Sequence, residues 1–284
     1  MRQIPNLEIH VAHTCNLSCE SCSHYSNHGH AGILSPQAAD HWMSQWSNRV
    51  KPGIFSLLGG EPTVNQRLAE FIPLSRKHWP DTNLQLVTNG FFLHRHPELP
   101  KVLQADPNVR LSLSIHHDSA AYRAKLIPIL ALLVKWKRDY GIRVDLRPSF
   151  KTWTRRYHGY GSSMEPFEDE QPRKSWEYCH ARYCKQLFQG KLWKCPPLAY
   201  LDLQNAKYPL SSRWAPYLNY TPLAPDCSDE ELDAFIDLED EPYCGMCPAS
   251  PQKFAMPSPL HKLASDMDET LARLETSPPL IVVN

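Results

Sequence analysis

Three closely spaced cysteines near the N-terminus are the residues of this sequence best suited to chemistry. In the segment HTCNLSCESC, Cys15, Cys19 and Cys22 are separated by three and two residues. Thiolates at this spacing can cover one face of a soft metal centre, and cysteine is the common ligand of iron–sulfur clusters. A structural zinc ion takes four ligands, so a histidine would have to complete its shell. The nearby histidines are His13, His24, His28 and His30. The spacing alone leaves an iron–sulfur cluster and a zinc site both open.

A second set of cysteines lies in the last part of the chain. Its members are Cys179, Cys184, Cys195, Cys227, Cys244 and Cys247. Cys244 and Cys247 form a C-x2-C pair, a spacing that serves zinc as well as iron–sulfur clusters. The first residues, MRQIPNLEIHVAH, contain no apolar signal segment, so we expect a cytoplasmic protein. In such a compartment clustered thiols bind metal more often than they form disulfides.

The composition and charge of the chain argue against two classes of binding partner, nucleic acids and membranes. Lys and Arg number 30 and Asp and Glu number 30, so the formal net charge is zero. A nucleic-acid surface would need a basic excess, and we expect no nucleic-acid partner. The longest apolar stretch, 126–134, contains Pro128 and is far shorter than the ~20 residues of a membrane span. We therefore expect no membrane partner.

Alternating strands and helices must position the first cysteine group. Apolar patterns predict strands over 7–12, 54–60, 84–90, 109–117 and 142–148, and helices over 35–50, 65–79 and 119–141. This alternation predicts an α/β fold with a parallel sheet and right-handed crossovers, in which five or six units make an open or partial barrel. Ligands of such sheets lie at the C-terminal ends of the strands.

The second half of the chain has a different character. We predict a core over 1–151, a polar, Gly- and Pro-rich linker or lid over 152–178, and a cysteine-rich domain over 179–284. The predicted elements of the last domain are a hairpin over 186–195, a short helix over 230–238 and an amphipathic C-terminal helix over 260–275. Most of the 26 prolines lie in this half, which favours irregular loops over continuous helices.

Gly59, Gly60, Glu61 and Pro62 follow the second predicted strand. A GGEP segment there, together with C-x3-C-x2-C after the first strand, resembles the radical S-adenosylmethionine (radical SAM) superfamily over roughly 7–150. The resemblance implies a partial (β/α)6 barrel. The family often has an aromatic residue before the third cysteine, where this sequence has Ser21, so the adenine contacts are expected to differ.

The resemblance also implies a mechanism. Cys15, Cys19 and Cys22 would hold three irons of a [4Fe–4S] cluster, and SAM would chelate the fourth. Gly59 and Gly60 would let the backbone approach the methionyl group, and a carboxylate at the next position would accept a hydrogen bond from its ammonium. One electron, from a donor such as flavodoxin or ferredoxin, would then produce a 5′-deoxyadenosyl radical that abstracts a substrate hydrogen.

Further SAM contacts are expected at the ends of later strands. By the same resemblance, Asn89, Ser114 and Arg147 would bind the ribose or the carboxylate of SAM. The alternative is that these residues serve ordinary strand-end and turn hydrogen bonding.

The second cysteine set resembles the SPASM and Twitch modules, which carry auxiliary iron–sulfur clusters. A full SPASM module needs about seven cysteines for two clusters, so the six here imply one auxiliary [4Fe–4S] cluster. We predict Cys184, Cys195, Cys244 and Cys247 as its ligands, with Cys179 as the rival first ligand. Cys227 is left over, and a structural zinc site is the alternative for the whole set.

These features predict an oxidoreductase. A hydroxylated small molecule such as a sugar or amino sugar would be oxidised, or epimerised if a thiol such as Cys227 returned a hydrogen. One alternative is a maturase of a ribosomally made peptide. The other is a non-catalytic iron–sulfur or zinc protein, against which the GGE segment argues because an electron carrier needs no SAM pocket.

Overall fold

A computed structural model describes residues 1–260 and contains one seven-stranded sheet of order β5-β4-β3-β2-β1-β6-β7. The strands are β1 (Arg2–Ala12), β2 (Val50–Gly59), β3 (Asn83–Thr88), β4 (Val109–Ser114), β5 (Val144–Arg147), β6 (Cys184–Phe188) and β7 (Lys191–Trp193). All neighbours are parallel except β6 and β7. This arrangement confirms the predicted α/β fold with its partial barrel.

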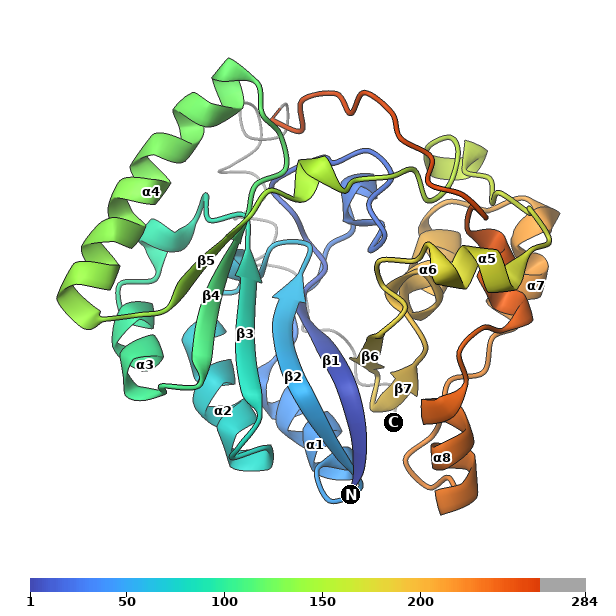
Figure 1. Ribbon diagram of the computed structural model, residues 1–284, viewed down its shortest axis with the longest axis horizontal. Helices are drawn as coiled ribbons and strands as arrows, with labels where there is room; N and C mark the ends of the chain where they lie inside the picture. Colours follow the sequence, from blue (N-terminus) through green and yellow to red (C-terminus); the bar gives the residue numbers. More distant parts are fainter. Residues whose placement is uncertain (261–284) are drawn as a thin grey trace.

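Helices connect the first five strands and cover one side of the sheet (Figure 1). They are α1 (Pro36–Trp46), α2 (Phe71–His78), α3 (Leu99–Ala105) and α4 (Ala120–Tyr140). Strand residues that point toward these helices are apolar and fully buried, as Leu7, Ile9 and Phe55 show. Because side chains alternate along a strand, the residues between them point to the opposite side. Those positions include Glu8 and Ser56, and they line a cavity.

The predicted hairpin over 186–195 is confirmed. Its turn, Gln189 and Gly190, has φ values of 54° and 73°, the left-handed backbone that a two-residue hairpin turn requires. The strand that opens this hairpin, β6, pairs with β1. One sheet therefore contains strands from both the predicted 1–151 core and the predicted 179–284 domain, and that division stays a prediction.

The second half contains more helix than its prolines suggested. Helix α6 spans Pro196–Lys207, α5 spans Pro172–Glu177 inside the predicted linker, and α7 spans Ala215–Leu218. Each has proline in its first turn, where the missing N–H has no intrahelical partner and the fixed φ suits a helix. The prolines therefore start helices here, so the expectation of irregular loops was wrong for these segments.

Other boundaries differ in smaller ways. Of the helix predicted over 65–79, only α2 is α-helical, and α3 was not predicted because its seven residues carry too little periodic signal. The short helix over 230–238 is confirmed as α8, Asp229–Asp237, which starts at a capping box between Ser228 and Glu231. The helix predicted over 260–275 lies, apart from its first residue, outside the described residues. Within the part of the chain that is described, no helix is long and apolar enough to cross a bilayer.

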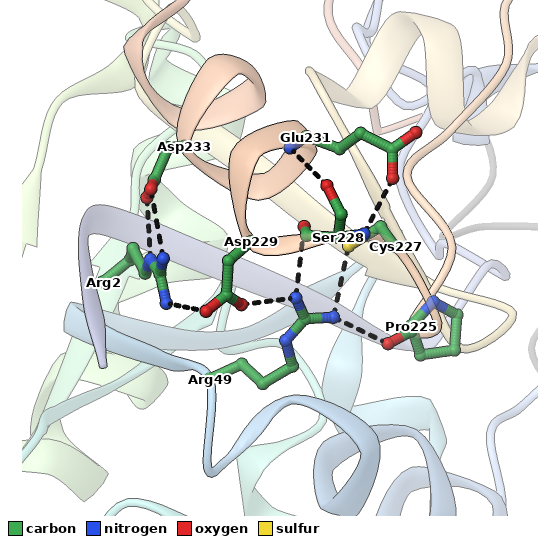
Figure 2. A network of polar contacts seen from close by, with 8 residues as sticks. All are labelled: Arg2, Arg49, Pro225, Cys227, Ser228, Asp229, Glu231 and Asp233. Carbon is green, nitrogen blue, oxygen red and sulfur yellow. Dashed lines mark hydrogen bonds and ion pairs between the residues drawn. The ribbon is translucent and has the colours of Figure 1, made fainter.

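Helix α8 is held against the starts of β1 and β2 by two arginines (Figure 2). Arg49 donates hydrogen bonds to the carbonyl of Pro225 at 2.8 Å and to Sγ of Cys227 at 3.2 Å. Arg2 forms ion pairs with Asp229 and Asp233. Cys227 lies beside Arg49, just before β2 begins. The glycine pair lies at the other end of this ten-residue strand, about 33 Å away. This distance argues against a hydrogen-donor role for Cys227.

Candidate active site

A cavity of about 630 Å³ opens over the polar side of the sheet. The loop after β1 contributes Cys15, Cys19 and Cys22 to its wall, and the end of β2 contributes 59–61. Two motifs that are far apart in sequence thus face one space at the C-terminal ends of adjacent strands. Its volume lies within the ~300–1,000 Å³ of small-molecule sites.

The cysteine loop is held by the segment that the sequence marked as a linker or lid. Ser21 has a left-handed backbone with a φ of 59°, and its Oγ accepts a hydrogen bond from the backbone N–H of Arg156 at 2.6 Å. Trp153 donates from its indole N–H to the carbonyl of Glu20 at 2.9 Å. The serine that replaces the family's aromatic residue therefore fixes 153–157 against the loop.

The last described residues also cover this loop. The segment 251–260, red in Figure 1, passes above the ends of the strands. The backbone N–H of Ser18 donates to the carbonyl of Pro259 at 3.1 Å, and a ring nitrogen of His117 lies 3.1 Å from the carbonyl of Met256. The cysteines are therefore enclosed by chain from both halves of the sequence.

The two glycines are required by the close approach of β2 to the end of β1. A Cβ on Gly59 would lie 2.1 Å from the carbonyl oxygen of Ala12, and a Cβ on Gly60 would lie 2.5 Å from that of Thr14. Both distances are shorter than any side chain tolerates, so only glycine fits. The same contact is fixed by a hydrogen bond from the N–H of Gly60 to the carbonyl of Ala12 at 2.8 Å.

Glu61 is buried and joins the ends of β2 and β3. Its Oε1 accepts from the N–H and Oγ1 of Thr63 at 3.0 and 2.5 Å and from Oγ1 of Thr88 at 2.5 Å. Its Oε2 accepts from the N–H of Asn89 at 2.7 Å. Burial raises the pKa of Glu61, and these hydrogen bonds act against that shift. Three donors therefore share Oε1, and one binds Oε2, whose second acceptor position is left for a ligand. These bonds give the side chain a positioning role between the strand ends, and its contact with the methionyl ammonium stays a prediction.

Replacing Glu61 with glutamine is expected to destabilise the protein by about 1–3 kcal/mol. The new amide group would direct its own hydrogens at a donor that now binds the carboxylate. Urea unfolding followed by tryptophan fluorescence measures the change, with Glu70→Gln as the control. Glu70 is an exposed partner of Arg67, and its substitution should change stability by less than ~0.5 kcal/mol. Equal unfolding midpoints for the two variants would contradict the positioning role.

The three predicted strand-end residues all line the cavity. Nδ2 of Asn89 donates to Oδ1 of Asn16 at 2.7 Å, which ties the end of β3 to the cysteine loop. Ser114 is buried at the end of β4, whereas Arg147 is exposed at the end of β5. Their use in binding SAM stays a prediction.

Four cysteines of the second group share a smaller apolar cavity. They are Cys179, Cys195, Cys244 and Cys247. Burial, and then the nearby thiolates of Cys179 and Cys244, raise the pKa of Cys247 to about 12. Arg156 and Lys194 line the same cavity and lower the pKa values of Cys247 and Cys244, respectively. Thiols that repel one another as anions suit a metal centre, which keeps them deprotonated. Among residues 1–260, no three His, Cys, Asp or Glu side chains are grouped closely enough to hold a single metal ion.

Cys184 lies in a different place. Its Sγ accepts a hydrogen bond from Nδ2 of Asn6 at 3.5 Å, and the thiol lies beside Glu8 in the wall of the large cavity. Burial, and then Glu8, raise the pKa of this thiol. The structure therefore groups the rival Cys179, and not Cys184, with the three other predicted ligands. The signal available in the sequence was the ten-residue gap from Cys179 to Gly190.

Comparison with known proteins supplies a family for the first half of the chain. The model of the radical SAM superfamily matches residues 9–144. The matched region includes all three cysteines of the first loop and the GGE segment. No curated protein matches the chain.

Several solved structures resemble the fold at low identity. Streptococcus suis SuiB bound to the precursor peptide SuiA is 12% identical with a TM-score of 0.44, over 85% of this chain and 66% of that one. anSMEcpe with bound AdoMet and the Cp18Cys peptide is 19% identical with a TM-score of 0.38, over 50% and 42% of the two chains. BtrN in complex with AdoMet and 2-DOIA is 21% identical with a TM-score of 0.38, over 52% and 59%. This chain thus spans less than two thirds of each, and likeness at this level assigns no substrate.

Proposed function

We propose that this chain, whose residues 9–144 match the model of the radical SAM superfamily, cleaves SAM reductively to oxidise or epimerise a small hydroxylated metabolite such as a sugar or amino sugar. The observation that carries the proposal is the shared cavity. One wall holds Cys15, Cys19 and Cys22, another holds the glycine pair, and polar side chains from the middle of the strands line the floor between them.

The side chains present fit the cofactors that the family uses. Three thiols on one loop would hold three irons of a [4Fe–4S] cluster and leave one iron for SAM. The fourth cysteine in the cavity wall, Cys184, lies on another element, at the start of β6 beside Glu8. When bound, this cluster and SAM supply a one-electron cleavage that yields a 5′-deoxyadenosyl radical. The chain's own part is to hold the loop rigidly through Ser21 and Trp153, and to fix the strand ends through Glu61.

The polar side of the sheet favours a hydrogen-bonding substrate. Side chains that face the cavity from the middle of the strands include Asn6, Ser56, Gln85 and Ser112. Ser56 donates to Asn6, and Gln85 donates to Ser112, but each hydroxyl and amide has further donor or acceptor positions. A hydroxylated molecule can bond to these positions, whereas an apolar one cannot.

We further propose that Cys179, Cys195, Cys244 and Cys247 hold an auxiliary [4Fe–4S] cluster. A net two-electron oxidation needs a site for the second electron, and this four-cysteine cavity offers one. Arg156 and Lys194 place positive charge beside thiolates that carry negative charge, which stabilises that charge. The first electron would come from a cytoplasmic donor such as flavodoxin or ferredoxin.

The test is SAM cleavage by the anaerobically reconstituted protein. With dithionite as reductant we expect 5′-deoxyadenosine and methionine in about equal amounts, and about eight irons per chain for two [4Fe–4S] clusters. Without dithionite neither product should form. Protein loaded with iron that makes no 5′-deoxyadenosine would overturn the proposal, and zinc at the first loop would do so as well. Turnover of a peptide but of no small molecule would redirect it to peptide maturation.

A further inference from the structure

A buried carboxylate faces the large cavity from the middle of β1. Glu8 is 7% exposed and lines the cavity together with its neighbours on β2 and β6. Its Oε1 accepts a hydrogen bond from Nδ2 of Asn6 at 2.8 Å, and its Oε2 accepts one from Nε2 of Gln186 at 2.7 Å. A third hydrogen bond comes from the thiol of Cys184. All three donors are neutral, so they orient the carboxylate but do not balance its charge.

Within residues 1–260, Glu8 forms no ion pair with a Lys, Arg or His side chain. The cation that influences it is Arg147, whose effect on the pKa of Glu8 is weaker than those of burial and the hydrogen bonds. Burial is the largest influence and raises that pKa. A buried acidic side chain is rarely left without a positive partner. Arg147 lines the same cavity without forming an ion pair with Glu8, so a cationic group of a ligand placed at Glu8 would be the partner that stabilises its carboxylate form.

The surroundings of Glu8 are fixed before any ligand arrives. Oγ of Ser56 donates to Oδ1 of Asn6 at 3.0 Å, and the hydroxyl of Tyr200 donates to Oε1 of Gln186 at 2.9 Å. Each amide therefore uses its oxygen elsewhere and presents its NH₂ group to Glu8. Such a preorganised array binds a ligand without a further cost of ordering its own side chains.

The strand register gives the distance between Glu8 and the glycine pair at the end of β2. Glu8 lies opposite Ser56 on β2, and Gly59 follows three residues later. At ~3.3 Å per residue, the carboxylate lies about 10 Å below the glycine pair. A ligand with one six-membered ring and its substituents fits that spacing.

We propose that Glu8 is the substrate-recognition site for an ammonium group, so that the substrate is a hydroxylated small molecule carrying a primary amine. The inference rests on the proposed function and narrows its substrate class. The ammonium would donate to Glu8, while Ser56 and the hydrogen-bonded pair of Gln85 and Ser112 face the hydroxyl groups of the ring.

The proposal is tested by affinity selection with matched pairs of small molecules. The reconstituted protein with SAM is incubated with a pool of amino sugars and aminocyclitols, each mixed with its N-acetyl counterpart, and the retained compounds are identified by mass spectrometry. We expect at least one free amine to be retained about tenfold or more over its N-acetyl form, because hydrogen bonds between charged partners are the strong ones. Glu8→Gln should remove this preference, and Glu8→Asp should keep part of it.

The control is Glu230→Gln, which removes an exposed carboxylate on α8 and should keep the full preference. Equal retention within every pair, including no retention of either form, would overturn the proposal, as would an unchanged preference in Glu8→Gln. Formation of 5′-deoxyadenosine is measured in parallel on the same samples. Its absence in the unaltered protein counts against the proposed function, whereas loss of the amine preference alone counts only against the role of Glu8.

Discussion

Replacing Cys19 with alanine is expected to reduce 5′-deoxyadenosine formation to background and to remove about four of the eight irons. Cys19 is 7% exposed and is the middle one of the three proposed ligands in the first loop. The two remaining thiols cannot hold three irons, so SAM loses the iron that would bind it. Iron analysis and chromatography of the nucleoside product measure the two effects.

The fold should survive this substitution, because the loop is also held through Ser21 and Ser18. A near-unchanged circular dichroism spectrum would show this. Cys227→Ala is the matched control, since that thiol lies beside Arg49 at the start of β2, and the variant should keep all its iron. Continued SAM cleavage by Cys19→Ala would show that the ligand assignment is wrong.

Replacing Cys179 with alanine is expected to halve the iron content to about four per chain while leaving SAM cleavage intact. Cys179 shares its cavity with Cys195, Cys244 and Cys247, and three thiols hold a cluster less completely than four. Product formation should fall with the iron, because the substrate radical then has nowhere to lose its second electron.

Cys184→Ala separates the two candidate ligand sets. Its thiol lies in the other cavity beside Glu8, so the variant should keep about eight irons. Iron loss from Cys184→Ala with full iron in Cys179→Ala would reverse the assignment and restore the ligand set first expected from the sequence. Iron loss from both variants would mean that these cysteines rearrange when the auxiliary cluster binds.

Local sequence signals predicted the parts of the site that depend on neighbours along the chain. The three cysteines of the first loop share one segment, so their spacing alone brought them together. The five strands of the core were predicted because their outward residues, such as Leu7 and Ile9, are apolar. The inward residues form an equally regular set, since Asn6 and Glu8 alternate with them, and that polar alternation was the available signal for the cavity wall.

Other parts depend on contacts that no local pattern encodes. The position of Cys184 depends on β6, because a thiol at the first residue of that strand faces the large cavity and not the one that holds Cys179. The hydrogen bonding of Glu61 depends on Thr88, which lies on a different strand. The high proline content predicted loops. Pro196 and Pro197 instead occupy the first turn of α6, where a helix accepts proline.

The pairing of β6 with β1 has a consequence for how the protein is made. β1 is an interior strand, bonded to β2 on one side and to β6 on the other. During synthesis, β1 leaves the ribosome long before residues 184–188, so one of its edges stays open to other chains in the meantime. A nascent chain stopped before β6 should therefore aggregate more readily than one stopped after β7, which places the risk of misassembly between those two points.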